Sequence, residues 1–265
     1  MKKISIFPLF EPDLPASEKY RLIKNANFTA VNIYWGDNDK HEQVQSAKEN
    51  GLTIDCIHSA NDNPNAIWEE GADGDARKNV LLACVEDCAQ YGVPTVAVHL
   101  TGFPPYPPVT ELGLQRLAEI VHLAEEKNVK LAFENLWTFE HLDAVFERFP
   151  SQNVGFCYDS GHENLNPHKD CLAAYGHRLF ALHINDNFAD GFDAHVLSFD
   201  GTINWDTTMA RLNKCKNIEF LTLEIYKLEK GEHEKSCIYK GWSASEFLSL
   251  AYQRAVSLKD LGASS

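Results

Sequence analysis

Short apolar runs alternate with longer segments of helical periodicity along the whole chain. This alternation is typical of βαβ units, which build a parallel sheet. The predicted strands are 3–9, 30–35, 53–59, 95–101, 129–135, 154–159, 179–185 and 219–226. The predicted helices are roughly 17–26, 39–50, 75–91, 110–127, 139–148, 168–177, 205–214 and 243–260. Eight such pairs favour a closed barrel over an open sheet, because a barrel buries both faces of each apolar strand.

The length and composition agree with one α/β domain of this type. The chain has 265 residues, and a (β/α)8 TIM barrel needs roughly 250. It is 44% hydrophobic and 23% charged, which is ordinary for a globular protein. No linker or low-complexity tract interrupts the alternation. We therefore expect a single TIM-barrel domain over residues 1–265.

The net charge indicates which class of partner to expect, and the cysteines indicate the cellular compartment. Lys and Arg number 24 and Asp and Glu 38, which gives a formal charge of −14. Because phosphate neutralisation by basic side chains dominates nucleic-acid affinity, a nucleic-acid partner is not expected. The sequence contains neither a signal peptide nor an apolar run long enough to span a membrane. Seven scattered cysteines, an odd number, indicate reduced thiols and a cytoplasmic location.

The candidate chemistry lies where the predicted strands end. Strands three to eight each finish with one polar residue, in order His58, His99, Glu134, Asp159, His183 and Glu224. Side chains alternate between the two faces of a strand. Two residues before each polar residue stands a small one, Cys56, Ala97, Ala132, Cys157, Ala181 or Thr222, which suits a crowded barrel interior. The polar residues are therefore expected to point toward the barrel axis at its carboxyl-terminal mouth.

This placement predicts a metal site. Glu134, Asp159, His183 and Glu224 would lie at one level, where ionised carboxylates repel each other unless a cation lies between them. A metal-free polar network is the alternative. A further set could add metal ligands or substrate contacts: His58, His99, His162, Asp193 and His195.

Four segments resemble the xylose isomerase-like barrel superfamily: Phe133–Asn135, Val154–His162, His183–Asp186 and Leu223–Glu224. In its ketose 3-epimerase branch, one ion is held by Glu, Asp, His and Glu. The resemblance implies that Glu134, Asp159, His183 and Glu224 hold a divalent ion, with Mn²⁺ favoured and Zn²⁺ or Co²⁺ as alternatives. It also implies that Glu134 and Glu224 are acid and base on opposite faces of a small sugar, in a reaction that removes a proton next to a carbonyl.

The sequence differs from the pattern of each of two family branches at one position, and the second branch offers an alternative activity. The epimerase branch carries a substrate-binding Arg near the position of Ala189. The abasic-site endonuclease branch uses nine ligands for three zinc ions, and this chain has a candidate for each. That branch also has a Lys soon after the strand-seven Asn-Asp pair, where this chain is acidic. A metal-dependent sugar isomerase or epimerase is our first hypothesis. An endonuclease IV-like zinc phosphodiesterase and a non-catalytic sugar-binding barrel are the alternatives.

Aromatic residues near strand ends and two long connections complete the predicted mouth. Trp35, Trp137 and Phe188 are candidates for stacking on a sugar. Connections 60–74 and 227–242 leave the carboxyl ends of strands three and eight, where barrel active sites lie. They are expected to be either lids or surface decoration. The family also makes a homodimer a possible assembly.

Overall fold

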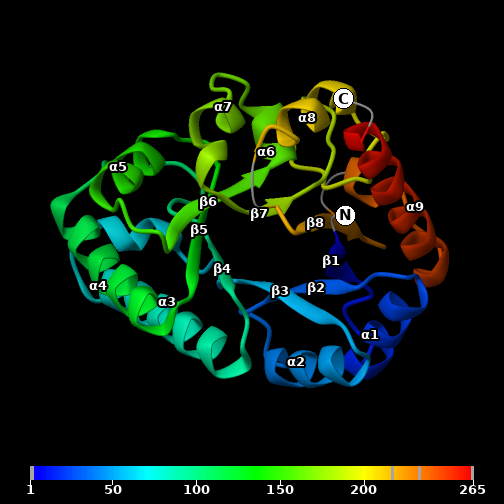
Figure 1. Ribbon diagram of the computed structural model, residues 1–265, viewed down its shortest axis with the longest axis horizontal. Coiled ribbons are helices and arrows are strands. Elements are labelled where there is room, and N and C mark those ends of the chain that lie inside the picture. Colours follow the sequence, from blue (N-terminus) through cyan, green and yellow to red (C-terminus); the bar gives the residue numbers. More distant parts are fainter. Residues whose placement is uncertain (1–2, 216–217, 232–233, 264–265) are drawn as a thin grey trace.

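The strands confirm the predicted barrel. The protein is described by a computed structural model that covers residues 3–215, 218–231 and 234–263. Eight parallel strands form one sheet in the order β7-β6-β5-β4-β3-β2-β1-β8, with the helices outside it (Figure 1). The strands are β1 Lys3–Phe10, β2 Ala30–Tyr34, β3 Thr53–His58, β4 Thr95–Val98, β5 Lys130–Glu134, β6 Val154–Asp159, β7 Leu179–His183 and β8 Phe220–Lys227.

The two outer members of that order, β7 and β8, close the barrel. Ile184, directly after β7, forms a parallel bridge with Leu223 on β8. Its N–H donates to the carbonyl of Thr222 at 2.9 Å, and the N–H of Glu224 donates to its carbonyl at 3.0 Å. The protein is therefore a single α/β TIM barrel whose last seam is short.

The outer layer follows the prediction except after β6. The helices are α1 Ala16–Asn25, α2 Lys40–Glu49, α3 Ala72–Tyr91, α4 Glu111–Lys127, α5 Glu140–Arg148, α6 Ser160–Leu165, α7 Cys171–Tyr175, α8 Trp205–Leu212 and α9 Ala244–Ala263, with 3-10 turns η1 Pro64–Trp68, η2 Gly176–Arg178 and η3 Glu234–Cys237. The sequence predicted one helix over 168–177, whereas the structure has α6, α7 and η2 in this region. Among the described residues, no helix has the length and apolar character needed to cross a membrane.

The strand interior and the helix-facing layer form separate cores, as the alternation of small and large residues predicted. Cys56, Ala97, Ala132 and Cys157 make a small buried cluster with Ala181 beside it. The large residues of opposite parity, such as Val98, Phe133 and Leu182, belong to the main core between strands and helices. Small interior residues leave room above them for the longer polar side chains at the strand ends.

The connection over residues 60–74 packs as a wall of the mouth. Its 3-10 turn η1 buries Pro64, Ile67 and Trp68, and the Trp68 indole N–H donates to the Leu100 carbonyl at 2.6 Å. Arg116 on α4 donates to the carbonyl of Ile67 at 3.1 Å and to those of Glu69 and Gly71. This packing holds the connection in place beside the strand ends. The second long connection, 227–242, includes residues 232–233, which lie outside the described part of the chain.

One half of the barrel interior is polar. Ser5, Asn32, Asp55 and Thr222 come from β1, β2, β3 and β8, and all four are buried. The pairing of β2 with β3 shifts at this level, so that Val31 pairs with Ile54 and Asn32 with Cys56. Asp55 is the extra residue of this bulge. The Thr222 hydroxyl donates to Asp55 Oδ2 at 2.6 Å, while Asp55 Oδ1 has no hydrogen-bond partner.

Replacing Asp55 by asparagine is expected to stabilise the protein at neutral pH. Burial raises the pKa of Asp55 to about 6, against the opposing hydrogen bond from Thr222. A folded-state pKa above the unfolded value of 3.8 means that stability falls as the pH rises from about 4 to about 6. Since one pKa unit corresponds to about 1.4 kcal/mol, Asp55→Asn should gain up to about 3 kcal/mol above pH 7 and nothing below pH 4. Urea unfolding of both proteins across this range measures the difference, and parallel pH curves would contradict the prediction.

Candidate metal centre and substrate cavity

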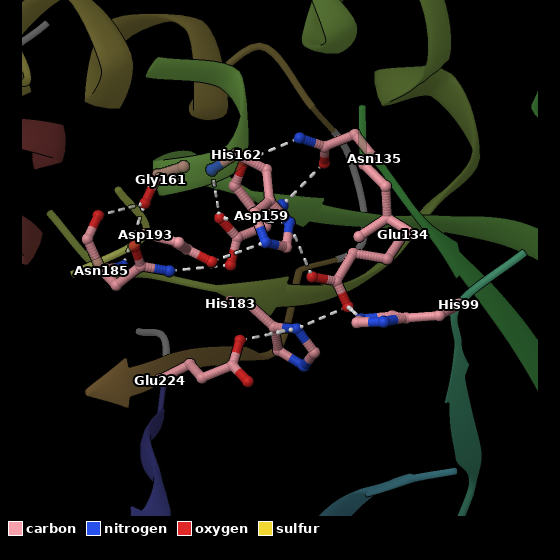
Figure 2. A network of polar contacts seen from close by, with 12 residues as sticks. His99, Glu134, Asn135, Asp159, Gly161, His162, His183, Asn185, Asp193 and Glu224 are labelled. Atoms are coloured by element: carbon pink, nitrogen blue, oxygen red, sulfur yellow. Dashed lines mark hydrogen bonds and ion pairs between the residues drawn. The ribbon is translucent and has the colours of Figure 1, made fainter. Parts of the chain in front are cut away.

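The structure brings together the four residues predicted to share one level of the barrel. Glu134 ends β5, Asp159 ends β6, His183 ends β7 and Glu224 lies on β8. One potential ligand atom from each lies within 4.8 Å of the others, and all four side chains are buried. Figure 2 shows them converging from separate strands on one small volume. The arrangement follows from the barrel, because its parallel strands all end at the same mouth.

Glu134 is the centre of this arrangement. Its Oε2 atom lies 2.9 Å from Nδ1 of His183, 3.1 Å from Nε2 of His99 and 3.6 Å from Nε2 of His58. Its Oε1 atom lies 3.1 Å from Nδ1 of His162. One carboxylate, 1% exposed, therefore faces four imidazoles. Nδ1 of His183 also lies 3.1 Å from Oε2 of Glu224, which places both glutamates beside the same ring nitrogen.

The five additional candidates join the same mouth and extend it in two directions. His58 and His99 form a group with Glu134, and His162, Asp193 and His195 form another. Among the described residues, the nine predicted ones thus fall within overlapping groups of potential ligands, three of which contain Glu134.

Two asparagines and a glycine hold Asp159. The Asn185 amide donates to Asp159 Oδ2 at 2.7 Å, and the N–H of His162 donates to Oδ1 at 2.7 Å, which makes Asp159 the N-cap of α6. The Asn135 side chain pairs with the Asp159 backbone through two bonds of 2.8 Å. A Cβ at Gly161 would overlap the side-chain oxygen of Asn185, so only glycine fits there. Sequence reasoning included Asn135 and Asn185 in motifs without giving them this role.

A folded loop after β7 presents Asp193 and His195. Asp186 anchors the loop, because its carboxylate accepts hydrogen bonds from the backbone of Phe199 and Ile203 and from the Trp205 indole, at 2.9–3.1 Å. Asp193 Oδ2 lies 3.0 Å from Nε2 of His162 and 2.9 Å from Nε2 of His195.

Nδ1 of His195 lies 3.0 Å from the Glu224 carbonyl, and its ring stacks on Tyr226 at 4.1 Å. These contacts join the loop after β7 to β8.

Neighbouring ionisable groups in the mouth shift one another's pKa values. Burial would raise the pKa of Glu134, but the imidazoles of His183 and His99 outweigh it and hold this pKa well below its usual range. Burial, helped by repulsion from Glu134 and opposed by His162, raises the pKa of Asp159 to about 7. Burial would lower the pKa of His183, but Cys157, Glu224 and Glu134 raise it well above its usual range. The site thus attracts positive charge to the space beside Nδ1 of His183.

The donor atoms fit a divalent cation. Glu134 Oε1, His183 Nδ1 and Glu224 Oε2 are buried and have no hydrogen-bond partner, although oppositely charged atoms lie close by. Two ligand atoms on one ion, each about 2.1 Å away, are separated by roughly 3.0–3.4 Å. The separations of 2.9 and 3.1 Å around His183 Nδ1 are close to this range. Three carboxylates and one imidazole suit Mn²⁺ or Co²⁺, and the groups richer in histidine suit Zn²⁺.

A cavity of about 460 Å³ opens above these residues. Glu134, Glu224, Trp137 and Tyr226 are among the residues that line it. Its wall also contains residues that sequence reasoning did not assign, namely Asn61, Asn63, Asn65, Thr101 and Phe103. The asparagine-rich run directly after β3 was the available signal for part of this wall.

The predicted substrate contacts of Trp35 and Phe188 are not supported, because neither residue lines the cavity. Trp35 is 5% exposed, its indole N–H donates to Asp87 at 2.7 Å, and its ring packs on Tyr91. It follows Tyr34 and so points to the helix side of the barrel rather than to the axis. Phe188 packs against the main core, under the amine of Lys235 at 5.0 Å. Trp137 lines the cavity, and its stacking on a sugar stays a prediction.

Comparison with known proteins identifies the family of this chain. Residues 20–238 match the model of the xylose isomerase-like TIM barrel. An uncharacterised protein from Sinorhizobium fredii is 35% identical over 144 residues, which are 50% of this chain and 46% of that protein. The chain thus spans about half the length of this relative.

Solved structures resemble the whole chain. A xylose isomerase domain protein from Alicyclobacillus acidocaldarius has a TM-score of 0.77 at 15% identity and covers 99% of this chain and 100% of its own. A D-psicose 3-epimerase from Clostridium cellulolyticum H10, solved with D-tagatose, has a TM-score of 0.73 at 14% identity and covers 100% of this chain and 99% of its own. At such identities these two structures support the fold, while the family model covers most of the sequence. The chain belongs to the xylose isomerase-like TIM barrel family.

Proposed function

We propose that the protein is a metal-dependent isomerase or epimerase that acts on a small sugar by moving a proton next to a carbonyl group. The observation that carries the proposal is the placement of Glu134 and Glu224. They come from β5 and β8, both line the cavity, and both lie beside Nδ1 of His183. A volume of about 460 Å³ lies within the range of small-molecule sites. The D-psicose 3-epimerase that shares the fold acts on a sugar, which supports the same class of substrate.

The two glutamates can exchange protons with opposite faces of a bound sugar. One carboxylate removes the proton next to the carbonyl, and the other returns a proton to the opposite face. A divalent ion held by Glu134, Asp159, His183 and Glu224 would supply a Lewis acid that stabilises the negative charge on the sugar oxygen. Trp137 and Tyr226 line the cavity and offer ring faces for the apolar side of the sugar. His162, beside Glu134, offers a hydrogen bond to a sugar hydroxyl.

Solvent exchange tests this function. Protein loaded with Mn²⁺ or Co²⁺ is incubated in D₂O with a panel of ketoses and keto-sugars, and each carbon-bound proton is followed by NMR. We expect deuterium at the carbon next to the carbonyl of at least one sugar, together with the epimer or isomer. Protein that binds metal but leaves every sugar of a broad panel undeuterated would contradict the proposal.

A second candidate is a zinc phosphodiesterase of the abasic-site endonuclease type. The specific observation in its favour is that overlapping groups of potential metal ligands, which include five histidines, extend across the mouth. Such groups could hold several ions, which activate water and stabilise the leaving oxygen of a phosphodiester. The formal charge of −14 opposes binding to DNA.

Metal content and DNA incision separate the two candidates. Elemental analysis of zinc-saturated protein should find about one tightly held ion per chain if the sugar enzyme is correct. The endonuclease predicts about three zinc ions and incision of duplex DNA that contains an abasic site. Inert DNA with zinc-replete protein would remove this second candidate.

A further inference from the structure

Asn32 contacts the metal-facing histidine from the other side of the barrel. It lies on β2, is 0% exposed, and its amide nitrogen lies 3.2 Å from Nε2 of His183 on β7. Strands β2 and β7 are not neighbours in the sheet, so this contact crosses the interior. The register shift between β2 and β3 begins at Asn32, on the polar side of the barrel. None of the ligand groups described above contains this residue.

The two ring nitrogens of His183 have different surroundings. Nδ1 faces Glu134 and Glu224, at 2.9 and 3.1 Å, in the space proposed for the ion (Figure 2). Nε2 faces Asn32. A neutral imidazole carries one hydrogen, and the nitrogen that binds a metal must be the one without it. If Nδ1 binds the ion, the hydrogen must lie on Nε2, where it needs an acceptor.

The Asn32 amide can supply that acceptor. In the observed rotamer its nitrogen is nearer to the ring, and its Oδ1 atom is buried without a hydrogen-bond partner. A half-turn of the amide exchanges the two atoms and brings Oδ1 to the Nε2 hydrogen. The buried polar side chains of Ser5 and Asp55 lie on the two strands that flank β2, so the surroundings of Asn32 are polar on both sides. The ring plane itself is held by stacking on His58 at 5.3 Å.

We propose that Asn32 is a positioning residue that keeps the hydrogen of His183 on Nε2 and thereby presents the Nδ1 lone pair to the divalent ion. This inference rests on the proposed function, because it requires an ion beside Nδ1. Residues that accept the second N–H of a metal-bound histidine fix its tautomer and orientation. Their loss typically weakens metal binding by about 10–100-fold.

Matched variants test the proposal through metal affinity. Asn32→Leu keeps the approximate volume and removes the acceptor, while Asn32→Asp keeps an acceptor at the same place. Titration calorimetry with Mn²⁺ and with Zn²⁺ should show affinity about 10–100-fold weaker for Asn32→Leu and within about threefold of the wild type, or tighter, for Asn32→Asp. A purely structural role would affect both variants alike, and this result or an unchanged Asn32→Leu affinity would overturn the proposal.

A spectroscopic measurement tests the unmodified protein and so does not depend on the folding of a variant. Nitrogen-15 NMR of the Zn²⁺-loaded wild type should assign the His183 hydrogen to Nε2. A hydrogen on Nδ1 would refute the inference while leaving metal binding intact. If the wild type binds neither ion, the proposed metal-dependent function fails together with the inference. If it binds metal and Asn32→Leu binds equally well, only the inference fails.

Discussion

Replacing Glu134 by glutamine is expected to lower kcat/KM for the sugar substrate by about 10⁴-fold and to weaken metal binding at the same time. A positioned general base contributes about 10²–10⁴-fold, and Glu134 also faces the proposed ion. The glutamine has the same shape but no charge, so Oε2 can no longer balance the imidazoles of His183 and His99, which lie 2.9 and 3.1 Å away. Steady-state kinetics and elemental analysis of the purified variant measure both effects.

Two further variants serve as controls for this prediction. One tests whether losing any carboxylate lowers activity, and the other distinguishes the catalytic acid from the catalytic base. Glu119→Gln removes an exposed carboxylate that pairs only at the surface with Lys78, and should leave kcat/KM within about twofold. Glu224→Gln should lose epimerisation as well, but in a different way. With one epimer as substrate, the variant that keeps the base for that epimer should still exchange the substrate proton with D₂O without inverting the carbon. With the other epimer as substrate, the other variant should show this exchange. Full activity of Glu134→Gln would rule out its assigned role.

The strand ends were predictable from sequence because the barrel repeats one rule at six of its eight strands. Small residues alternate with large ones, and a polar residue stands two positions after the last small one. Glu134 stands two positions after Ala132, and His183 two positions after Ala181. Since all strands run parallel, this local pattern determines a shared location in space. Strand parity predicted that Glu134, Asp159, His183 and Glu224 point inward, and in the structure their ligand atoms lie within 4.8 Å of one another.

The parts that sequence reasoning missed depend on contacts between distant segments. Trp35 follows a strand like the other candidates, but it has the outward parity and packs on α3. The wall formed by Asn63 and Phe103 depends on how two loops fold over the mouth, and no strand periodicity records this. The contact between Asn32 and His183 joins residues 151 positions apart. A register shift in β2–β3 pairing accompanies it, and a pattern of polar and apolar residues does not reveal such a shift.

The buried charges explain why metal binding and folding should be linked. Glu134, Asp159 and Glu224 are 1%, 0% and 6% exposed and lie within one small volume. Without a divalent ion, the protein can balance them with protons, as the raised pKa values of Asp159 and His183 indicate. Protons and the ion therefore compete for the same site, and the ion must displace a proton from His183 to bind Nδ1.

Removal of the metal is expected to lower the melting temperature by roughly 8–16 °C at neutral pH. An ion present at about 1,000 times its dissociation constant stabilises the folded state by about 4 kcal/mol, and each kcal/mol shifts the melting temperature of a chain of this size by about 2–4 °C. The shift should grow as the pH rises from about 6 to about 8, because fewer protons then compete for His183, whose pKa lies above its usual range. Thermal unfolding with saturating Mn²⁺ or Zn²⁺ and with EDTA measures it. Glu134→Gln should lose most of this response and Glu119→Gln should keep it, whereas identical melting curves with metal and with chelator would show that the buried carboxylates are balanced without an ion.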